Sequence, residues 1–173
     1  AGELTPPIYL AAMRDRMLGL AVEVSEGAIW ANAAHSAVAA QLARVPAAAA
    51  DGFFRANMIP AVIDDDRAAA DAVNRRTMTG YLALPNYWNY WREAGYVEEM
   101  AAVETALAAG ERDRLPSLMS DAWLHDVTLS GSASDVRDGI AAWAELGVVP
   151  IAVMSSTSGG QAKAVGELFA AYG

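Results

Sequence analysis

The 173-residue sequence contains no cysteine, which excludes disulfide bonds, thiol catalysis and zinc–thiolate sites together. It also lacks any apolar run close to the roughly 18 residues that a membrane-spanning helix requires, so no membrane partner is expected. The first residues do not show the charged and then apolar order of a signal peptide. A reducing cytoplasm is therefore the expected location.

Positive charge is scarce as well. One lysine, Lys163, and 11 arginines face 21 acidic residues, and the formal net charge is -9. Nucleic-acid binding relies on cations that neutralise phosphates, so no nucleic-acid partner is expected. Hydrophobic residues make up 54% of the chain, which excludes a disordered acidic tail. The length suits one compact domain over residues 1–173 and is too short for two ordinary domains.

The sequence offers little for metal binding. His35 and His125 are isolated histidines without the spacing of metal ligands. Asp64, Asp65 and Asp66 follow one another, so their side chains point in different directions. We interpret them as the start of a helix, where acids meet the positive end of the helix dipole. No metal site is expected.

Short apolar runs alternate with segments of helical periodicity along the whole chain. The runs predict four strands, at 8–13, 28–31, 53–63 and 148–154. The periodic segments predict helices, at 17–22, 35–45, 67–81, 97–107, 136–143 and 161–169. Ser132 and Asp135 form a capping box ahead of the helix at 136–143.

The alternation predicts an α/β fold with parallel strands and right-handed crossovers. The stretch of about 81–130 is too long for a crossover, so we expect a helical insertion at one end of the sheet, before the last strand. Four βα units are half of an eightfold β/α barrel, which typically takes about 250 residues. Alone, they would leave two sheet edges unpaired and an apolar face open. A small open sheet covered on both faces is the competing fold.

The chain begins at Ala1 rather than at methionine, and strand-like residues begin almost at once, at Ile8. We therefore expect this chain to be a piece of a longer protein.

Several short segments, taken in order, carry a family resemblance. They are Pro7–Met13 with Arg16–Leu18 and Ser25–Gly27, then Leu84–Tyr87 with Trp91 and Gly95-Tyr96, then Ser120-Asp121 and Gly131–Val136, and finally Gly147-Val148. They resemble the fifth strand and helix, the insertion after the seventh strand, and the approach to the eighth strand of luciferase-like monooxygenases. Each motif is weak alone, and their common order makes the set fairly specific.

This resemblance implies the C-terminal half, strands five to eight, of a TIM barrel. The family holds FMN or the deazaflavin coenzyme F420 at the carboxyl ends of its strands, and transfers hydride to or from small organic substrates or activates oxygen. The branch that uses F420 looks closer, because the first strand ends in Ala-Ala-Met and leads into Arg16-Met17-Leu18. The cofactor supplies the redox chemistry, and the protein supplies orientation and electrostatics.

The sequence departs from the family pattern at two points. Arg14-Asp15 stands where the family has Gly-Pro, and Ser25-Glu26-Gly27 stands where it has Ala-Asp-Gly. An arginine can pair with a phosphate through its planar fork, although Asp15 beside it opposes that. The family's first four strands have no counterpart here, so this chain is expected to hold only part of a site.

On this basis seven residues are candidates for cofactor binding: Ala12, Met13, Arg14, Trp30, Asn32, Ser155 and Ser156. Arg14 could contact a phosphate at a helix N-terminus, as could Arg16, or either could be a solvated helix start. Trp30 could form an aromatic wall, with Asn32 as a hydrogen bonder, or Trp30 could pack in the core under a helix. The loop from Ser155 to Gly160 could cradle an anion or be a plain loop. No catalytic residue is evident.

Three functions stay open. The first is part of a flavin- or F420-dependent oxidoreductase for a small organic substrate; the second is a flavin-binding module without turnover; the third is a half-barrel that pairs in a homodimer. The aromatic cluster at 87–91 could line a pocket or an interface, or simply pack between helices. F420 carries an acidic tail, and the chain is itself acidic, so F420 binding must depend on a local group of arginines; FMN faces less opposition.

Overall fold

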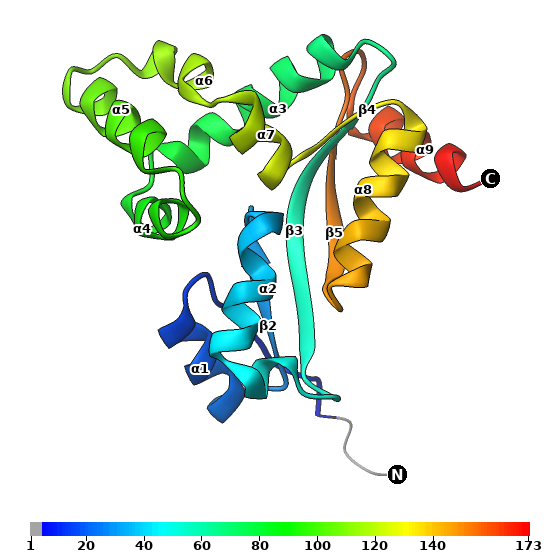
Figure 1. Ribbon diagram of the computed structural model, residues 1–173. Coiled ribbons are helices and arrows are strands. Elements are labelled where there is room, and N and C mark those ends of the chain that lie inside the picture. The colour runs from blue at the N-terminus through cyan, green and yellow to red at the C-terminus, as the bar shows by residue number, and fades with distance from the viewer. Residues whose placement is uncertain (1–4) are drawn as a thin grey trace.

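A computed structural model describes residues 5–173 of the chain, and Figure 1 shows its arrangement. The strands are β1 (Tyr9–Ala11), β2 (Gly27–Ala31), β3 (Phe54–Ile63), β4 (Leu129–Gly131) and β5 (Val149–Ser155). The helices are α1 (Asp15–Val24), α2 (His35–Arg44), α3 (Arg67–Leu82), α4 (Pro85–Glu93), α5 (Val97–Ala108), α6 (Leu115–Leu118), α7 (Asp121–Val127), α8 (Ala133–Glu145) and α9 (Gln161–Tyr172), with 3-10 turns η1 (Pro46–Ala49) and η2 (Arg112–Arg114).

The sheet is parallel throughout residues 5–173, which confirms the predicted α/β class. Each of the four predicted strands forms, with its ends within two residues of the expected ones. The expectation of only four strands was wrong, because β4 adds a fifth. This strand has three residues and no apolar run, so its sequence carries little strand signal.

The long strand β3 organises the sheet. It pairs with β2 over Phe54–Met58, with β4 over Ala61–Ile63 and with β5 over Ala56–Val62. The β5 segment overlaps both of the others, so β2 and β4 share one edge of β3 and β5 takes the opposite edge. The four strands that the sequence predicted therefore lie side by side in the order β1, β2, β3 and β5.

A proline inside this central strand is explained by the shared edge. Along that edge the Met58 carbonyl accepts from the Asn32 N–H (2.9 Å), and the Asp64 N–H donates to the Gly131 carbonyl (2.8 Å). Alternate residues of a strand direct their backbone polar groups to the same edge, so Pro60 faces the gap between β2 and β4. Proline has no N–H to donate, and it occupies the place where no partner strand needs one.

The two faces of the sheet differ. Along one face Trp30, Ile59 and Ala61 are fully buried. Along the other, large apolar side chains are exposed at Tyr9 (37%), Met58 (38%), Val149 (48%) and Ile151 (37%). No helix within residues 5–173 has both the length and the apolar character that a bilayer crossing requires.

Glycine is required at one position of the exposed face. Gly27 pairs with Tyr9 on one side and with Phe54 on the other, and these two rings stack with centroids 4.4 Å apart. A Cβ at residue 27 would lie 2.5 Å from the Phe54 carbonyl oxygen, so the side chain must be absent for the rings to close over the backbone.

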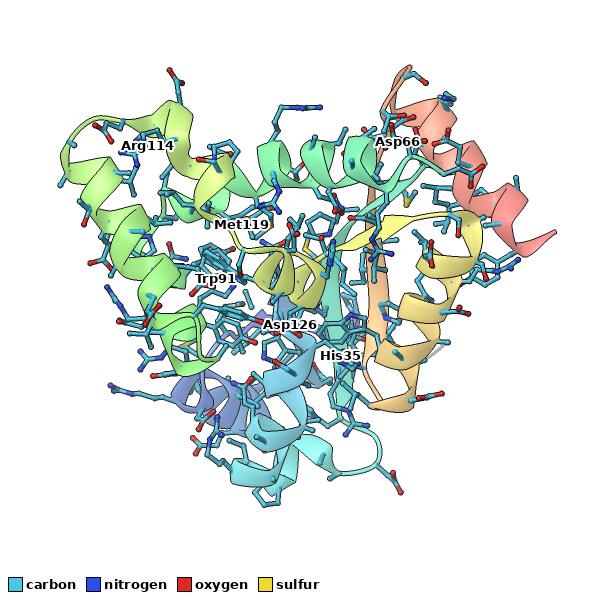
Figure 2. The ribbon with its side chains drawn as sticks, turned by 45° about the horizontal axis from the view of Figure 1, so that its top comes forward. His35, Asp66, Trp91, Arg114, Met119 and Asp126 are labelled. Carbon is cyan, nitrogen blue, oxygen red and sulfur yellow. The ribbon has the colours of Figure 1, made fainter. Side chains whose placement is uncertain are left out.

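Helices α4 to α7, residues 85–127, lie within the predicted insertion, and we call them the roof. Their interior is aromatic: Trp91 meets Trp123 edge-on at 5.3 Å, and Tyr96 stacks on Trp123 at 5.4 Å. The roof is tied to α2 through Asp126, which accepts from the Ser36 N–H (2.8 Å) and hydroxyl (2.7 Å). Figure 2 shows Asp126 beside the start of α2, with Trp91 inside the roof.

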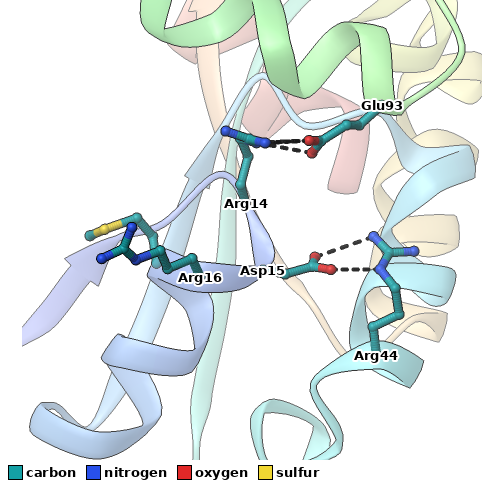
Figure 3. A pocket seen from close by; sticks show the side chains of 6 residues that line it. Arg14, Asp15, Arg16, Arg44 and Glu93 are labelled. Carbon is teal, nitrogen blue, oxygen red and sulfur yellow. Dashed lines mark hydrogen bonds and ion pairs between the residues drawn. The ribbon is translucent and has the colours of Figure 1, made fainter.

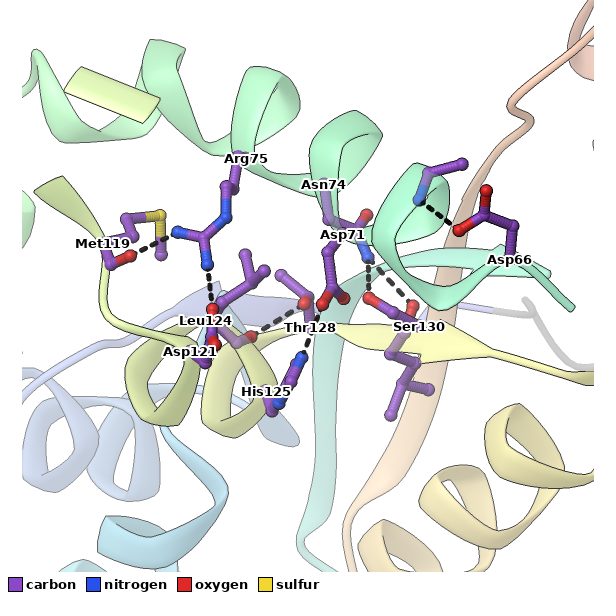
Figure 4. Close-up of polar contacts among 12 residues, drawn as sticks. Asp66, Asp71, Asn74, Arg75, Met119, Asp121, Leu124, His125, Thr128 and Ser130 are labelled. Atoms are coloured by element: carbon purple, nitrogen blue, oxygen red, sulfur yellow. Dashed lines mark hydrogen bonds and ion pairs between the residues drawn. The ribbon is translucent and has the colours of Figure 1, made fainter. Parts of the chain in front are cut away.

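Two predicted helix starts are confirmed. Ser132 and Asp135 form the reciprocal capping box of α8, and the Ser132 hydrogen bonds lower the pKa of Asp135. Asp66 caps α3 by accepting from the Ala69 N–H (3.1 Å), as Figure 4 shows. The aspartate run at 64–66 therefore serves a helix start, as its sequence indicated.

Candidate functional site

A hollow of about 270 Å³ lies at the carboxyl ends of β1 and β2, between the sheet and α4 of the roof. Its lining combines strand ends, the first turn of α1 and the first turn of α4: Ala11, Met13, Arg14, Met17, Ile29, Ala31, Asn86 and Tyr87. The carboxyl ends of strands are where parallel α/β folds gather their binding residues. Met13 and Arg14, both predicted to bind a cofactor, lie in this lining.

The loop that follows β2 is held tightly beside the hollow. The Asn32 carbonyl accepts from the Trp91 indole N–H (3.3 Å). The Ala33 N–H donates to the Asn57 side-chain oxygen (3.2 Å), and the Ala34 N–H donates to the Tyr90 hydroxyl (3.0 Å). Partners from β3 and α4 therefore fix three successive residues of the loop.

Asn32 has two unusual properties within this loop. Its φ is +59°, the one left-handed conformation among the non-glycine residues of 5–173. Its side chain is buried, yet the amide nitrogen Nδ2 has no hydrogen-bond partner within the described chain. A buried donor without a partner is costly, and the Asn57 amide nitrogen of β3 is likewise buried and unpartnered.

Trp30 lies on the other face of the sheet. It has no exposed surface, and its indole N–H donates to the Gln41 side-chain oxygen of α2 (3.1 Å). The Gln41 amide in turn donates to the Met13 carbonyl (3.1 Å). The position of Trp30 matches the core-packing interpretation, and Gln41 connects that core to the rim of the hollow. Ala12 is likewise fully buried, with its N–H on the Ile29 carbonyl (3.0 Å).

An open groove of about 730 Å³ adjoins the hollow and carries three arginines, Arg14, Arg16 and Arg44 (Figure 3). Arg14 forms a two-pronged ion pair with Glu93 of α4, which raises the pKa of Arg14. Arg44 pairs in the same way with Asp15 (2.6 and 3.2 Å), and these hydrogen bonds lower the pKa of Asp15. Arg16 has no ion-pair partner within residues 5–173.

Tyr87 closes the hollow from the roof. Its ring stacks on Trp91 with centroids 5.3 Å apart and an interplanar angle of 24°, and it meets Tyr81 edge-on at 5.5 Å. Trp91 is fully buried, so the Tyr87 ring rests on a fixed surface. Burial raises the pKa of the Tyr87 hydroxyl, with a smaller contribution from Tyr81.

The predicted residues Ser155 and Ser156 lie elsewhere. They line a separate hollow of about 390 Å³, together with Gly159 and Gly160. Ile151 is level with Ala31 across the sheet, because both are in register with Met58. Ser155 is four residues further along its strand, which is about 13 Å at the usual rise per residue. The structure therefore does not bring these serines to the hollow that Arg14 lines.

The loop after β5 is occupied by internal contacts. The Thr157 hydroxyl donates to Asp64 and lowers the pKa of that carboxyl. The Ser156 hydroxyl donates to the Ser158 carbonyl (2.9 Å), and the Lys163 ammonium donates to the Ser158 hydroxyl (2.7 Å). These contacts order the loop without leaving an unpartnered buried donor among them.

Other polar clusters in the described chain serve the fold. Figure 4 shows the buried Asn74 amide of α3 donating to the Leu129 carbonyl and to the Ser130 hydroxyl of β4, both at 2.9 Å. His125 is paired with Asp71 (2.9 Å). No group of three or more histidine, cysteine or acidic side chains within residues 5–173 is placed to hold a metal ion.

Sequence reasoning missed Gln41 and Asn57, which hold parts of the site, and Asn86, which lines the hollow. Asn57 gave a signal, since a polar residue in a buried strand needs a partner. Tyr87 and Tyr90 belonged to the aromatic cluster for which a pocket was one of the open interpretations. Gln41 gave no signal, because the sequence does not distinguish a buried glutamine on a helix from an exposed one.

Comparison with known families adds an independent finding. The model of the family described as luciferase-like monooxygenase matches residues 1–149. No curated protein sequence matches the chain.

Two solved structures have a similar fold. One is the coenzyme F420-dependent tetrahydromethanopterin reductase from Methanopyrus kandleri, with a TM-score of 0.70 and 17% identity over 95% of this chain and 49% of that chain. The other is an F420-dependent secondary alcohol dehydrogenase in complex with an F420–acetone adduct, with a TM-score of 0.60 and 12% identity over 95% of this chain and 47% of that chain. At these identities the likeness shows a shared fold, and the chain spans about half the length of each.

Proposed function

Because the chain belongs to the luciferase-like monooxygenase family, we propose that it is the C-terminal half-barrel of an oxidoreductase that uses coenzyme F420 or FMN on a small organic substrate. The observation that carries this proposal is the hollow at the carboxyl ends of β1 and β2, which shares Arg14 and Met17 with the arginine groove beside it.

The half-barrel part of the proposal is supported by the two unequal faces of the sheet. A closed barrel buries an apolar face in its interior, and here Tyr9, Met58, Val149 and Ile151 expose such a face. Within residues 5–173, β1 pairs only with β2 and β5 only with β3, so each has an edge available for a further strand. The match to about half of two longer chains points the same way.

The residues present fit an acidic flavin-type cofactor. Arg14 and Arg16 would hold its anionic part in the groove, and the Asn32 amide would donate to a polar atom of its ring system. Met13 would contribute apolar contact within the hollow. The deazaflavin or flavin supplies the hydride chemistry when it is bound. Ser155 and Ser156, in their separate hollow, stay a prediction.

The chain's own part in the reaction is to bind and to orient. Four hydrogen bonds to backbone groups fix the loop from Asn32 to Ala34, so the backbone that carries the Asn32 side chain is set before any ligand binds. The apolar side chains of Met13, Met17 and Ile29 would contact the organic substrate, which would lie in the hollow next to the groove.

A binding module without turnover is the second candidate, and one observation favours it. Within residues 5–173, the two carboxylates that line the adjoining groove, Glu93 and Asp15, are both held in ion pairs with arginines. Neither is therefore poised as a general acid or base. Steady-state oxidation of the reduced cofactor separates the two candidates, since sustained turnover excludes the binding module.

Cofactor titration tests the proposal. Separate absorbance titrations of the chain with F420 and with FMN should show saturable binding of at least one. Arg14→Gln should weaken that binding, and Glu93→Gln should strengthen it by releasing Arg14 from its ion pair. Arg76→Gln is the charge-matched control, because Arg76 is exposed on α3 and lines neither cavity. Equal affinities in all four chains, or no binding of either cofactor, would refute the proposal.

A further inference from the structure

The large apolar side chains that residues 5–173 expose are concentrated at the two edges of the sheet. They lie in the β1–α1 segment (8–24), in the β5–α9 segment (149–172) and at Met58 on the open face between them; only Leu84 and Val97 lie elsewhere. A contiguous exposed apolar surface of this kind marks a place that another chain covers.

The open face of the sheet is suited to burial. Side chains alternate along a strand, so the residues in register with Tyr9 and Ile151 share one face. Strands β1, β2, β3 and β5 direct only uncharged side chains to this face, among them Ala11, Met58 and Val153. Covering the face therefore buries no unpaired charge.

The edge of β1 offers backbone groups to a further strand. The Ala12 N–H donates to the Ile29 carbonyl of β2 (3.0 Å), so the even-numbered residues of β1 direct their backbone groups to β2. The N–H and carbonyl groups of Tyr9 and Ala11 therefore face the other way, where no strand of residues 5–173 meets them.

The edge of β5 offers the matching set. The Met58 carbonyl accepts from β2's side of the sheet, so the odd-numbered residues of β3 direct their backbone groups to β5. In a parallel ladder Asn57 bonds to the neighbours of its register partner Pro150, and not to Pro150 itself. Pro150, Ala152 and Met154 therefore face the open edge.

The two edges are offset along the strand direction. Register pairs join one row across the sheet, which consists of Ala11, Ile29, Ala56 and Val149. Strand β1 ends in this row and β5 begins in it. The strands of a TIM barrel close with a shear of about eight residues, and therefore of about four residues for each half.

A second copy of the chain satisfies this geometry. A two-fold rotation about the barrel axis keeps all strands parallel and doubles the four strands of the row to eight. A step of about four residues along β5 moves Ala11 of the second copy from the level of Val149 to that of Val153, and its Tyr9 to that of Ile151. Because the step is even, the side chains of the open face all point inward.

The backbone groups match in this register. The Ala152 N–H meets the Tyr9 carbonyl of the second copy, and the Ala152 carbonyl meets its Ala11 N–H. Pro150 has no N–H to donate, and its nitrogen faces Pro7 of the second copy, which lies before β1 begins. The proline therefore removes no bond from the new ladder.

The helices that follow the two edge strands also match. Each carries exposed apolar residues three or four positions apart, and thus on one side of the helix: Met17, Leu20 and Val24 on α1, and Val165, Phe169 and Tyr172 on α9. In the outer ring of a closed barrel, α9 of one copy is the neighbour of α1 of the other, so the two apolar stripes can cover each other.

We propose that the open face and its two edges bind a second copy of this chain, and that the two copies close one eight-stranded barrel through two β5–β1 seams. Ser155 of one copy is then level with Met13 of the other. Each seam therefore brings Ser155 and Ser156 to Met13 and Arg14, which lie apart within one chain. This inference rests on the half-barrel part of the proposed function.

Disulfide mapping tests the register, because the chain has no cysteine of its own. Ala11→Cys and Val153→Cys chains are co-expressed and oxidised, and intact masses identify the linked species. A disulfide between unlike chains cannot form within one chain, since each carries a single cysteine. The matched control pairs Ala11→Cys with Val149→Cys, because Val149 lies on the same face of β5 and about 13 Å away at the usual rise per residue.

We expect a linked dimer of unlike chains from the first pair and none from the control. A link in the control alone, equal yields in both, or a link in neither overturns the proposal.

Sedimentation equilibrium without cofactor tests the association itself. The wild type should show twice the chain mass of 18.2 kDa. Ile151→Asp places a charge in the interior of the closed barrel and should weaken the dimer roughly a hundredfold or more, although the side chain is accessible in the single chain. The control Val97→Asp changes an exposed residue at the start of α5 and should leave the dimer intact.

A monomeric wild type overturns the proposal and assigns the face to a different occupant. A dimer that Ile151→Asp does not weaken also overturns it, because the open face would then lie outside the interface. The disulfide mapping does not depend on the folding of Ile151→Asp. Both experiments omit the cofactor, so their failure is distinguishable from failure of the cofactor titration.

Discussion

The left-handed conformation of Asn32 leads to a stability prediction that can be worked out from the structure. Residues with a side chain lose about 1–2 kcal/mol in this region, while glycine enters it freely. Asn32→Ala and Asn32→Gly both remove the buried amide, and they differ only in whether the backbone strain persists. Part of this stability advantage of glycine is lost, roughly 0.5–1 kcal/mol, because glycine gives the unfolded chain more conformational freedom.

The glycine variant should therefore be more stable than the alanine variant by about 1 kcal/mol. In urea unfolding, with a slope of about 2 kcal/mol per molar for a domain of this size, the midpoints should differ by about 0.5 M. Asn89 on the exposed face of α4 supplies the control, since in a helix the order reverses and the alanine variant is favoured by about 1 kcal/mol.

An alanine variant at position 32 as stable as the glycine variant would refute the reasoning, because the loop would then not impose the conformation. A difference of the same sign at position 89 would also refute it, since the effect would then belong to glycine in general and not to the loop after β2.

Three further perturbations have outcomes set by contacts in the structure. Gly27→Ala places a Cβ against the Phe54 backbone and should destabilise the fold by roughly 1–3 kcal/mol in urea unfolding; an unchanged midpoint would show that the strands can separate there. Arg44→Gln removes the partner that lowers the pKa of Asp15. The stability that this ion pair contributes is present above the unfolded pKa of 3.8 and is lost as pH falls through the lower folded pKa. The unfolding curves of the two chains should therefore differ at neutral pH and converge in acid, and a difference that stays constant with pH would contradict this. Asn74→Ala removes both side-chain hydrogen bonds to β4 and should cost roughly 1–3 kcal/mol, with faster amide exchange in β4 than in β2; uniform exchange would contradict the anchoring role.

Local patterns predicted the parts of the fold that local physics decides. The apolar runs located four strands, and the Ser132 and Asp135 pair located the start of α8. Strand β4 escaped because its three residues form a strand only through pairing with Ala61–Ile63, which lie more than 60 positions earlier in the chain. A local pattern of apolar residues does not predict pairing with such a distant segment.

The candidate site shows the same division. Position at a strand end singled out Met13, Arg14 and Asn32. The features that give these residues their properties come from distant segments: Glu93, which neutralises Arg14, is 79 residues away, and Trp91, which holds the Asn32 carbonyl, is 59 away. The sequence does not decide on which face of the sheet Trp30 lies, because β2 is largely buried on both sides. Only the tertiary structure shows which face the indole occupies.

The attachment of the roof has a consequence for how such proteins can diversify. The chain leaves β3 after Ile63 and returns through β4, where Ile63 and Gly131 are paired neighbours. The excursion of residues 64–128, which is mostly helical, thus begins and ends at one point of the sheet. Residues 64–128 contribute no strand to the sheet. The length and sequence of this segment can therefore change while the register of the strands is kept. A lineage can therefore change the roof above the hollow while the parallel sheet beneath it is inherited unaltered.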